Sequence, residues 1–307
     1  YIKRHIDLIV RHPFVDVKAI RKAKLSIVVD AVNSTGGIAV PALLKALGVF
    51  RIKQLYCDPN GKFPHNPEPL PENIQTICKT VKSGKHDLGI IVDPDVDRLA
   101  LVQEDGKPFG EEYTLVAVAE YVLSRKKGNT VSNLSSTRAL RDVTEKAGGK
   151  YQAAAVGEVN VVSTMKETKA VIGGEGNGGI IVPDFHYGRD ALIGIALFLT
   201  HLASSRKSAS DLRKSYPSYF ISKNKIELTP AINVDKVLDL IRVKYNGEKV
   251  NTIDGVKIDF EREREWVHLR KSNTEPIIRI YAESADESRA NALAGRIMED
   301  IRQAARK

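Results

Sequence analysis

The chain has 307 residues, 42% of them hydrophobic, which suffices for about two domains with ordinary cores. Its formal net charge of +9 comes from basic residues spread along the chain without interleaved aromatic residues, which argues against a nucleic-acid partner. The longest apolar run, residues 191–200, is too short to cross a bilayer and is typical of a buried helix, so no membrane partner is expected. Cys57 and Cys78 have no metal-ligand spacing, which indicates reduced thiols in a cytoplasmic protein. The oligomeric state stays open.

Strands and helices alternate through the first third of the chain. Apolar runs and helical periodicity there predict strands at residues 25–29, 51–56, 85–92 and 99–102, and helices at residues 40–47 and 72–82. The next hundred residues repeat this order. They predict helices at residues 113–124, 137–147 and 159–167, strands at 130–133, 151–156 and 170–173, and a long helix from Arg189.

In the last part of the chain, strands and helices no longer alternate regularly. After a predicted linker at residues 204–217 we expect strands at 219–228, 256–260, 266–269 and 277–282, and helices at 234–244 and 287–305. The fold class is therefore α/β: two consecutive mixed-sheet α/β/α domains followed by a smaller α+β C-terminal domain. The predicted boundaries are residues 1–104, 105–216 and 217–307.

Three carboxylates stand in the tight loop between two predicted strands. Asp93, Asp95 and Asp97 alternate along this loop, and Arg98 follows them. A calcium EF-hand has a similar acidic pattern, but it needs glycine where Arg98 stands and helices on both sides. A solvated acidic turn explains the cluster less well because Arg98 lies against it. We expect Asp93, Asp95 and Asp97 to bind Mg²⁺, which prefers a few carboxylates together with water or phosphate oxygens.

A second polar loop, residues 270–276, is predicted to bind an oxyanion. Arg270 offers a bidentate fork and Lys271 a point charge, while hydroxyl, amide and backbone donors follow at Ser272, Asn273 and Thr274. The Ser-Asn-Thr run alone would indicate an ordinary hairpin turn. The two adjacent cations favour phosphate binding.

A third loop, residues 173–179, contains five glycines and one acid. Glycine permits close approach of the backbone, so Glu175 and Asn177 are candidates for hydrogen bonds to hydroxyl groups of a polar ligand. A glycine-rich hairpin without a ligand explains the loop about equally well. It is not a dinucleotide-binding fingerprint, since no helix follows it directly.

The seven histidines are scattered, and no two have metal-ligand spacing along the chain. Most are therefore expected to be surface or core residues. His186 is the exception, because residues 184–190 follow the glycine-rich loop and are expected to fold over the same pocket.

Together the three loops resemble those of the α-D-phosphohexomutase family, which comprises phosphoglucomutases, phosphomannomutases and phosphoglucosamine mutases. Residues 93–98 match its D-x-D-x-D-R magnesium loop, and residues 270–276 match its R-x-S-[GN]-T-E-P phosphate loop. Residues 174–179 match its G-E-x-S-G-[GH] sugar loop, with Asn177 in place of serine. Residues 30–37 and 60–69 also look like family loops, so the likeness runs from about residue 20 to the end.

The resemblance implies a fold, an activity and a set of roles. Such enzymes interconvert hexose 1-phosphate and 6-phosphate, with glucose, mannose or glucosamine as the sugar, through a phosphoserine and a hexose 1,6-bisphosphate. The residues that match are Asp93, Asp95 and Asp97 for Mg²⁺, Arg98 for catalysis, Glu175 and Asn177 for the sugar, and Arg270, Ser272, Asn273 and Thr274 for the phosphate that is not transferred. His186 is a second catalytic candidate, because of its place after the glycine-rich loop.

Two departures from the family pattern limit which of the family's roles can be assigned to this chain. The nucleophilic serine belongs to a T-A-S-H-N-P-like loop in the family's first domain, and the 307 residues contain no such loop, so we expect this chain to lack that domain. Ala155 stands where many members have a lysine general base, which leaves Glu158, His186 and Arg189 as candidates. The alternative function is a non-catalytic module that binds sugar phosphate and Mg²⁺.

Overall fold

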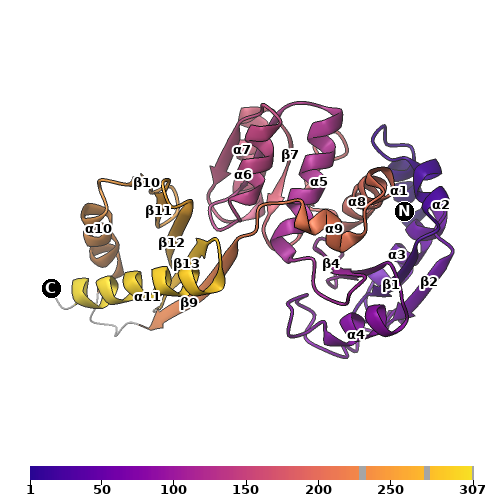
Figure 1. The fold of residues 1–307 in the computed structure, drawn as a ribbon, viewed down its shortest axis with the longest axis horizontal. Helices are drawn as coiled ribbons and strands as arrows, with labels where there is room; N and C mark the ends of the chain where they lie inside the picture. The colour runs from indigo at the N-terminus through magenta and orange to yellow at the C-terminus, as the bar shows by residue number, and fades with distance from the viewer. Residues whose placement is uncertain (228–232, 273–276, 306–307) are drawn as a thin grey trace. The chain divides into compact units, whose positions relative to one another are not determined.

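A computed structural model describes residues 1–227, 233–272 and 277–305 (Figure 1). Contacts divide the chain into two compact units. The first unit comprises residues 1–153 and 157–216, and the second comprises residues 154–156 and 217–307. The predicted sites at Asn273 and Thr274 lie outside the described residues.

The first sheet of the first unit has four strands in the order β2-β1-β3-β4. These are β1 (Ser26–Asp30), β2 (Arg51–Leu55), β3 (Leu88–Val92) and β4 (Leu99–Gln103). β1 runs parallel to β2 and β3, whereas β3 and β4 form an antiparallel hairpin. Every residue of β1, β3 and β4 is buried, as expected for a sheet covered on both faces. The helices α3 (Gly36–Ala46) and α4 (Gln75–Ser83) pack against it.

The second sheet repeats this order as β6-β5-β7-β8. Its strands are β5 (Asn129–Asn133), β6 (Tyr151–Ala154), β7 (Ala170–Glu175) and β8 (Gly179–Ile181). β5 and β7 are parallel, and β7 and β8 form an antiparallel hairpin. The helices that pack with it are α5 (Glu111–Arg125), α6 (Ala139–Lys146) and α7 (Glu158–Thr168).

One helix, α8 (Ala191–Ser205), connects the two halves of the first unit. It contacts β4 of the first sheet and β8 of the second. It also contacts α3, α5 and the two N-terminal helices α1 (Ile2–Val10) and α2 (Val17–Ala23). Its residues are buried on all sides, which agrees with the buried helix predicted from its apolar run. The Asp190 side chain caps it by accepting the backbone N–H groups of Leu192 and Ile193.

The second unit contains a five-stranded antiparallel sheet in the order β10-β11-β12-β13-β9. Its elements are β9 (Phe220–Glu227), α10 (Val234–Lys244), β10 (Lys249–Asn251), β11 (Val256–Phe260), β12 (Glu265–Lys271), β13 (Ile277–Ser284) and α11 (Glu287–Ala304). α11 packs on β13, β9 and β12, and α10 packs on α11. Buried aliphatic residues of the sheet and these helices form one core, which includes Ile241, Leu269 and Ile297.

The predicted fold class is confirmed, and the differences are local. Residues 204–217 are not a bare linker, because α8 runs to Ser205 and α9 (Ala209–Lys214) follows. β8 and β10 were not predicted, since three residues are too few to show a period. The predicted domain boundaries stay predictions.

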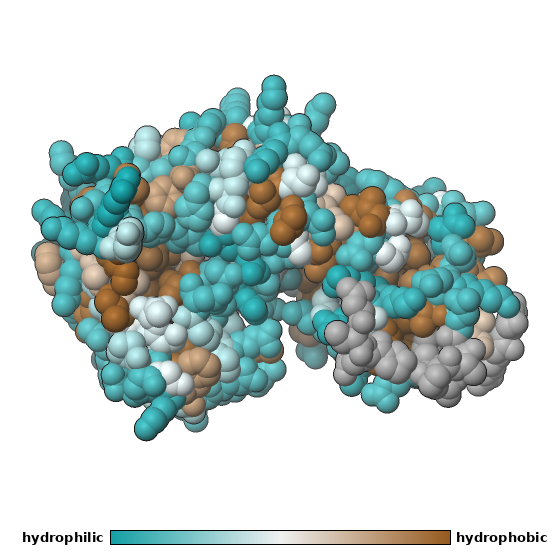
Figure 2. All heavy atoms as spheres, turned by 180° about the vertical axis from the view of Figure 1, so that it is seen from behind, coloured by the Kyte–Doolittle hydropathy of each residue, from teal (hydrophilic) through white to brown (hydrophobic). Residues whose placement is uncertain are grey.

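The described helices include none that is long and apolar enough to span a membrane. On the face shown in Figure 2, hydrophilic side chains predominate and hydrophobic ones form small groups.

Candidate functional site

The acidic loop joins β3 to β4 and holds three carboxylates close together. One ligand oxygen from each of Asp93, Asp95 and Asp97 lies within 4.8 Å of the others. Asp93 is buried at 4% exposure, and Asp95 is exposed to solvent. Asp97 Oδ1 is buried and has no hydrogen-bond partner in the described part of the chain. Its ion pair with Arg98 Nε is 3.8 Å long. An all-oxygen donor set with a buried oxygen that makes no hydrogen bond suits a hard cation such as Mg²⁺.

The shape of this loop is set by Asp93 and by a strained residue. Asp93 Oδ1 accepts the backbone N–H groups of Asp97 at 3.1 Å and Arg98 at 3.0 Å. Val96, which precedes Asp97, has a φ of 64°, a left-handed conformation that β-branched residues rarely adopt. The Val96 carbonyl accepts the backbone N–H of Ala191 at the start of α8, at 3.0 Å. The acidic loop is therefore held by the Asp93 side chain within it and by the start of α8 next to it.

The charges in the loop are mutually dependent. Burial raises the pKa of Asp93 to about 7, and the neighbouring carboxylates of Asp97 and Asp95 add to this rise, against the backbone N–H of Arg98. Arg98 Nε lies 3.3 Å from Asp93 Oδ2, and its Nη1 lies 3.3 Å from Glu68 Oε1. The carboxylates of the loop thus pair with two guanidinium groups, those of Arg98 and Arg189.

The glycine-rich loop joins β7 to β8 and touches the acidic loop through the backbone. Leu99 N donates to the carbonyl of Gly178 at 3.0 Å, and Arg98 forms an isolated bridge with Gly179. Gly178 has a φ of +87°, and a Cβ there would lie 2.4 Å from the Leu99 carbonyl oxygen. Only glycine permits this approach without displacing backbone. The structure therefore brings together two loops that the sequence places about eighty residues apart.

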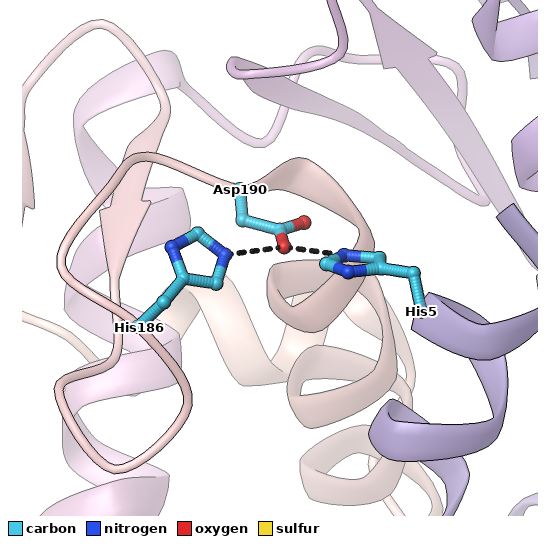
Figure 3. A group of neighbouring side chains, drawn as sticks. All are labelled: His5, His186 and Asp190. Carbon is cyan, nitrogen blue, oxygen red and sulfur yellow. Dashed lines mark hydrogen bonds and ion pairs between the residues drawn. The ribbon is translucent and has the colours of Figure 1, made fainter. Parts of the chain in front are cut away.

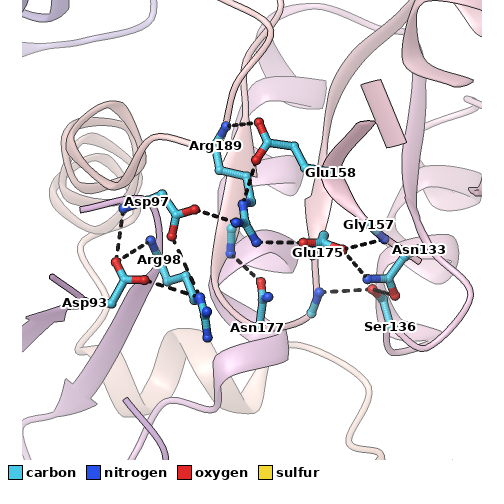
Figure 4. Close-up of polar contacts among 12 residues, drawn as sticks. Asp93, Asp97, Arg98, Asn133, Ser136, Gly157, Glu158, Glu175, Asn177 and Arg189 are labelled. Atoms are coloured by element: carbon cyan, nitrogen blue, oxygen red, sulfur yellow. Dashed lines mark hydrogen bonds and ion pairs between the residues drawn. The ribbon is translucent and has the colours of Figure 1, made fainter. Parts of the chain in front are cut away.

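Glu175 is buried, and both of its oxygens have protein partners (Figure 4). Oε1 accepts Asn133 Nδ2 at 2.9 Å and Gly157 N at 3.2 Å, and Oε2 accepts Arg189 Nη1 at 2.7 Å. Asn177 is half-buried, and its Oδ1 accepts the backbone N–H of Gly179 at 3.2 Å. Glu175 is thus less free than the sequence suggested, because a ligand hydroxyl must replace or share one of these bonds.

Arg189 pairs with three carboxylates from three segments. Its Nη2 lies 2.5 Å from Asp97 Oδ2, its Nε lies 3.0 Å from Glu158 Oε2, and its Nη1 reaches Glu175. Burial acts to lower the pKa of Arg189, but the three carboxylates raise it above its ordinary value. Arg189 is therefore unsuited to act as a general base. The sequence suggested no such bridge, because its partners are distant along the chain.

His186 hydrogen-bonds to a carboxylate in the turn before α8. Its Nε2 donates to Asp190 Oδ2 at 2.9 Å, and His5 Nε2 from α1 donates to the same oxygen at 2.7 Å (Figure 3). Burial acts to raise the pKa of Asp190, but the hydrogen bonds from His186 and His5 outweigh it and lower that pKa. No local pattern of residues predicts that these two histidines meet.

The described part of the predicted phosphate loop lies in the second unit. Arg270 Nε at the end of β12 donates to Asp254 Oδ1 at 3.1 Å. Buried His268 Nε2 donates to the Asp254 carbonyl at 2.7 Å, and burial lowers the pKa of His268 to about 4. Ser272 N donates to the Ile277 carbonyl at 3.0 Å. Asp254 therefore orients Arg270 through its Nε, an arrangement that leaves the fork of the guanidinium group suited to an oxyanion.

Models of one protein family match the chain in three consecutive places. The model for phosphoglucomutase/phosphomannomutase α/β/α domain II matches residues 3–106. That for α/β/α domain III matches residues 110–219, and that for the C-terminal domain matches residues 224–300.

Curated relatives agree with these matches. A phosphoglucomutase/phosphomannomutase of Thermococcus kodakarensis is 36% identical over 293 residues, which cover 94% of this chain and 63% of the relative. A probable phosphoglucosamine mutase of Methanopyrus kandleri is 32% identical, over 97% of this chain and 65% of the relative. The chain thus spans somewhat less than two thirds of the length of these relatives.

Solved structures show the same architecture. A phosphoglucomutase/phosphomannomutase family protein from Burkholderia thailandensis superposes with a TM-score of 0.78 at 31% identity, over 94% of this chain and 62% of that one. The fold is also that of a Thermus thermophilus structure described as a phosphomannomutase, with a TM-score of 0.79 at 23% identity, over 97% of this chain and 66% of that one.

Proposed function

Since this chain belongs to the phosphoglucomutase/phosphomannomutase family, we propose that it forms the metal-, sugar- and phosphate-binding parts of a phosphohexomutase. Such an enzyme interconverts hexose 1-phosphate and hexose 6-phosphate through a phosphoserine and a hexose 1,6-bisphosphate. The observation that carries the proposal is the contact between the acidic loop of Asp93, Asp95 and Asp97 and the loop that bears Glu175. A metal-bound phosphoryl group and a sugar would thereby be held side by side.

In this proposal Asp93, Asp95 and Asp97 would hold Mg²⁺, and the chemistry that the ion would supply is neutralisation of negative charge on a phosphoryl group. Arg98 adds a guanidinium beside the same carboxylates, where it can contact a phosphoryl oxygen. Asp97 would use its Oδ1 for the metal while its Oδ2 stays paired with Arg189, so that the two cations share one carboxylate. Arg189 then keeps Glu158 and Glu175 as partners.

Glu175 and Asn177 are proposed to bind sugar hydroxyls. The fixed position of Glu175 supports this role, because a carboxylate held by Asn133 and Gly157 loses little conformational freedom when a hydroxyl donates to it. The general base is proposed to be Glu158 or His186. Both side chains are partly exposed. They also lie on either side of the same point: a Cβ added to Gly188 would lie 3.2 Å from His186 Nδ1 and 3.6 Å from Glu158 Oε1.

The phosphate that is not transferred is proposed to bind Arg270, Ser272, Asn273 and Thr274 in the second unit. Support comes from the orientation of Arg270 by Asp254, since a preoriented guanidinium is suited to bidentate phosphate binding. Turning the bisphosphate round would present its other phosphate to the metal. Reaction in both directions follows from that exchange.

We propose that the phosphoryl group is donated by a phosphoserine that residues 1–307 do not supply. Ser34 contacts the acidic loop, but it donates its hydroxyl to the Pro94 carbonyl at 2.7 Å, a bond that does not activate it as a nucleophile. The two free cysteines support a cytoplasmic location for the protein.

The competing function is a binding module without turnover. Activity is therefore compared between the 307-residue chain and the same chain extended at Tyr1 by a family domain that carries the serine. Each is given Mg²⁺, a trace of hexose 1,6-bisphosphate, and the 1-phosphate of glucose, mannose or glucosamine in turn. We expect only the extended chain to form 6-phosphate, with the preferred sugar set by the relative rates.

Two results would change this conclusion. Turnover by the 307-residue chain, free of contaminating enzyme, would require a nucleophile within it. An inactive extended chain that still binds hexose phosphate in a Mg²⁺-dependent way would favour the binding module.

The phosphate site is tested by Arg270→Lys, which keeps the charge but loses the bidentate fork. The free energy of hexose-phosphate binding, measured by calorimetry, should weaken by about 1–3 kcal/mol.

A further inference from the structure

Two imidazoles from distant segments converge on one carboxylate oxygen at the start of α8. His5 Nε2 lies 2.7 Å and His186 Nε2 lies 2.9 Å from Asp190 Oδ2. The three ligand atoms all lie within 4.8 Å of one another. Figure 3 shows both rings pointing at the carboxylate, His5 from α1 and His186 from the loop before α8.

The groups are held in this arrangement by their surroundings. Asp190 Oδ1 accepts the backbone N–H groups of Leu192 at 2.7 Å and Ile193 at 3.2 Å, so the carboxylate is fixed and Oδ2 faces the histidines. The Phe185 ring lies 5.1 Å from the His5 ring and 5.1 Å from the His186 ring, between centroids. The cluster is therefore organised by the helix cap and by ring packing as well as by its own hydrogen bonds.

We propose that His5, His186 and Asp190 bind a divalent transition-metal ion of the Zn²⁺ class. Two imidazole nitrogens and one carboxylate oxygen suit borderline ions such as Zn²⁺, whereas the all-oxygen acidic loop suits Mg²⁺. Metal–ligand bonds of about 2.0–2.2 Å place tetrahedral ligands about 3.3 Å apart, so each imidazole must withdraw from Oδ2 by only about 0.5 Å. The His5 and His186 side chains are 35% and 41% exposed, which leaves room for a water ligand and for entry of the ion.

The proposed ion would lie next to residues that hold the acidic loop. Asp190 stands between Arg189, which pairs with Asp97, and Ala191, whose N–H donates to the Val96 carbonyl. A shift of Asp190 toward an ion therefore acts on both contacts. We expect Zn²⁺ to change the Mg²⁺ affinity of the acidic loop by a few-fold. This coupling rests on the proposed role of that loop, whereas the Zn²⁺ site does not.

The experiment is a Zn²⁺ titration by calorimetry in excess Mg²⁺, which occupies the acidic loop. We expect one Zn²⁺ per chain, and His5→Gln should weaken its binding at least tenfold. The matched control is His201→Gln, because His201 Nε2 also bonds to a carboxylate, Glu120, at 3.2 Å, but within the described residues no second histidine completes a metal-ligand group with that pair. The control should bind Zn²⁺ as the unsubstituted chain does. Equal binding by His5→Gln and the unsubstituted chain would overturn the site.

A second measurement needs no variant. Zinc X-ray absorption of the unsubstituted chain loaded with one equivalent should show two imidazole ligands, and a spectrum without imidazole would also overturn the site. Loss of the proposed mutase function would leave both results unchanged, so the two failures are distinguishable. A Mg²⁺ affinity that is equal with and without Zn²⁺ would remove the coupling alone.

Discussion

The two sheets of the first unit share one topology and differ in the chemistry of one loop. In each sheet the third strand along the chain lies beside the first of its strands and turns back through a loop into an antiparallel fourth strand. In the first sheet that loop carries Asp93, Asp95 and Asp97, and in the second it carries glycines and Glu175. Topology therefore places the loops, while the side chains decide what each can bind.

The two loops also differ in the burial and hydrogen bonding of their carboxylates. Asp95 is exposed to solvent, and Asp97 keeps an oxygen without a hydrogen bond in the described part of the chain. Glu175 is buried at 5% exposure and fully bonded. The first loop thus offers an ion an exposed carboxylate and an oxygen that makes no hydrogen bond, whereas a ligand of the second loop must share or replace bonds that Glu175 already makes. Four changes test this distinction, beginning with the one of largest expected effect.

Arg189→Met removes a cation that pairs with carboxylates of both loops. It leaves Asp97, Glu158 and Glu175 without this partner, so the metal-free chain should lose about 3 kcal/mol of unfolding free energy in urea. Mg²⁺ should bind more tightly than before and restore part of the loss, because Asp97 no longer has a competing partner. The control is Arg141→Met, which breaks an exposed pair with Glu145 and should cost under about 1 kcal/mol. Weaker Mg²⁺ binding by Arg189→Met would contradict the competition.

Gly178→Ala acts on the backbone contact between the loops. A methyl group would meet the Leu99 carbonyl at 2.4 Å in a residue with a φ of +87°, so we expect a loss of about 2–3 kcal/mol in unfolding free energy. Gly61→Ala is the matched control, since Gly61 has a φ of +73° but no atom within 4 Å of the added Cβ. Gly61→Ala should lower the unfolding free energy by about 1 kcal/mol. Equal losses would show that the contact with Leu99 contributes nothing.

Asp95→Asn and Glu175→Gln form a pair that separates the two loops. Asp95→Asn removes a ligand charge from an exposed position, so Mg²⁺ affinity should fall about tenfold or more, or 1.4 kcal/mol, with little change in stability. Glu175→Gln should weaken hexose-phosphate binding and leave Mg²⁺ affinity within about threefold of its original value. Calorimetry measures both ligands on both variants. The opposite pattern would reverse the assignment of the loops.

The pH dependence of Mg²⁺ binding should follow Asp93. Its pKa is raised to about 7 in the metal-free protein, so it carries a proton at pH 6 that the metal must displace. We expect nearly one proton to be released per Mg²⁺ at pH 6 and almost none at pH 8, with affinity falling about tenfold for each pH unit well below 7. Calorimetry in two buffers of different ionisation enthalpy counts the protons. The same number of protons at both pH values would exclude Asp93 as the titrating group.

Protonation of Asp93 acts in opposite directions on stability and on metal binding. It stabilises the metal-free fold and weakens Mg²⁺ binding. Because the folded pKa of Asp93 lies above the ordinary value of 3.8, the metal-free fold gains stability from its protonation at low pH. That contribution is lost as the pH rises through about 7.

What the sequence could predict depended on the distance between partners along the chain. The acidic loop was recognisable because Asp93, Asp95 and Asp97 stand within five residues, and the strands around it were recognisable as apolar runs. His5 and Asp190 are separated by 185 positions, and no local pattern encodes such a contact. The burial of Glu175 was likewise invisible, since it results from packing against Asn133 and Gly157.

Three consecutive residues at the start of α8 have three separate tasks. Arg189 pairs with both loops, Asp190 caps the helix and holds two histidines, and Ala191 bonds to the strained Val96. Inserting or deleting one residue here would rotate the helix by about 100° relative to its neighbours, and every one of these contacts would be lost together. Homologous chains should therefore differ in length before residue 189 and keep the spacing from there to the buried helix, so that this turn serves as a fixed reference point in any alignment of the family.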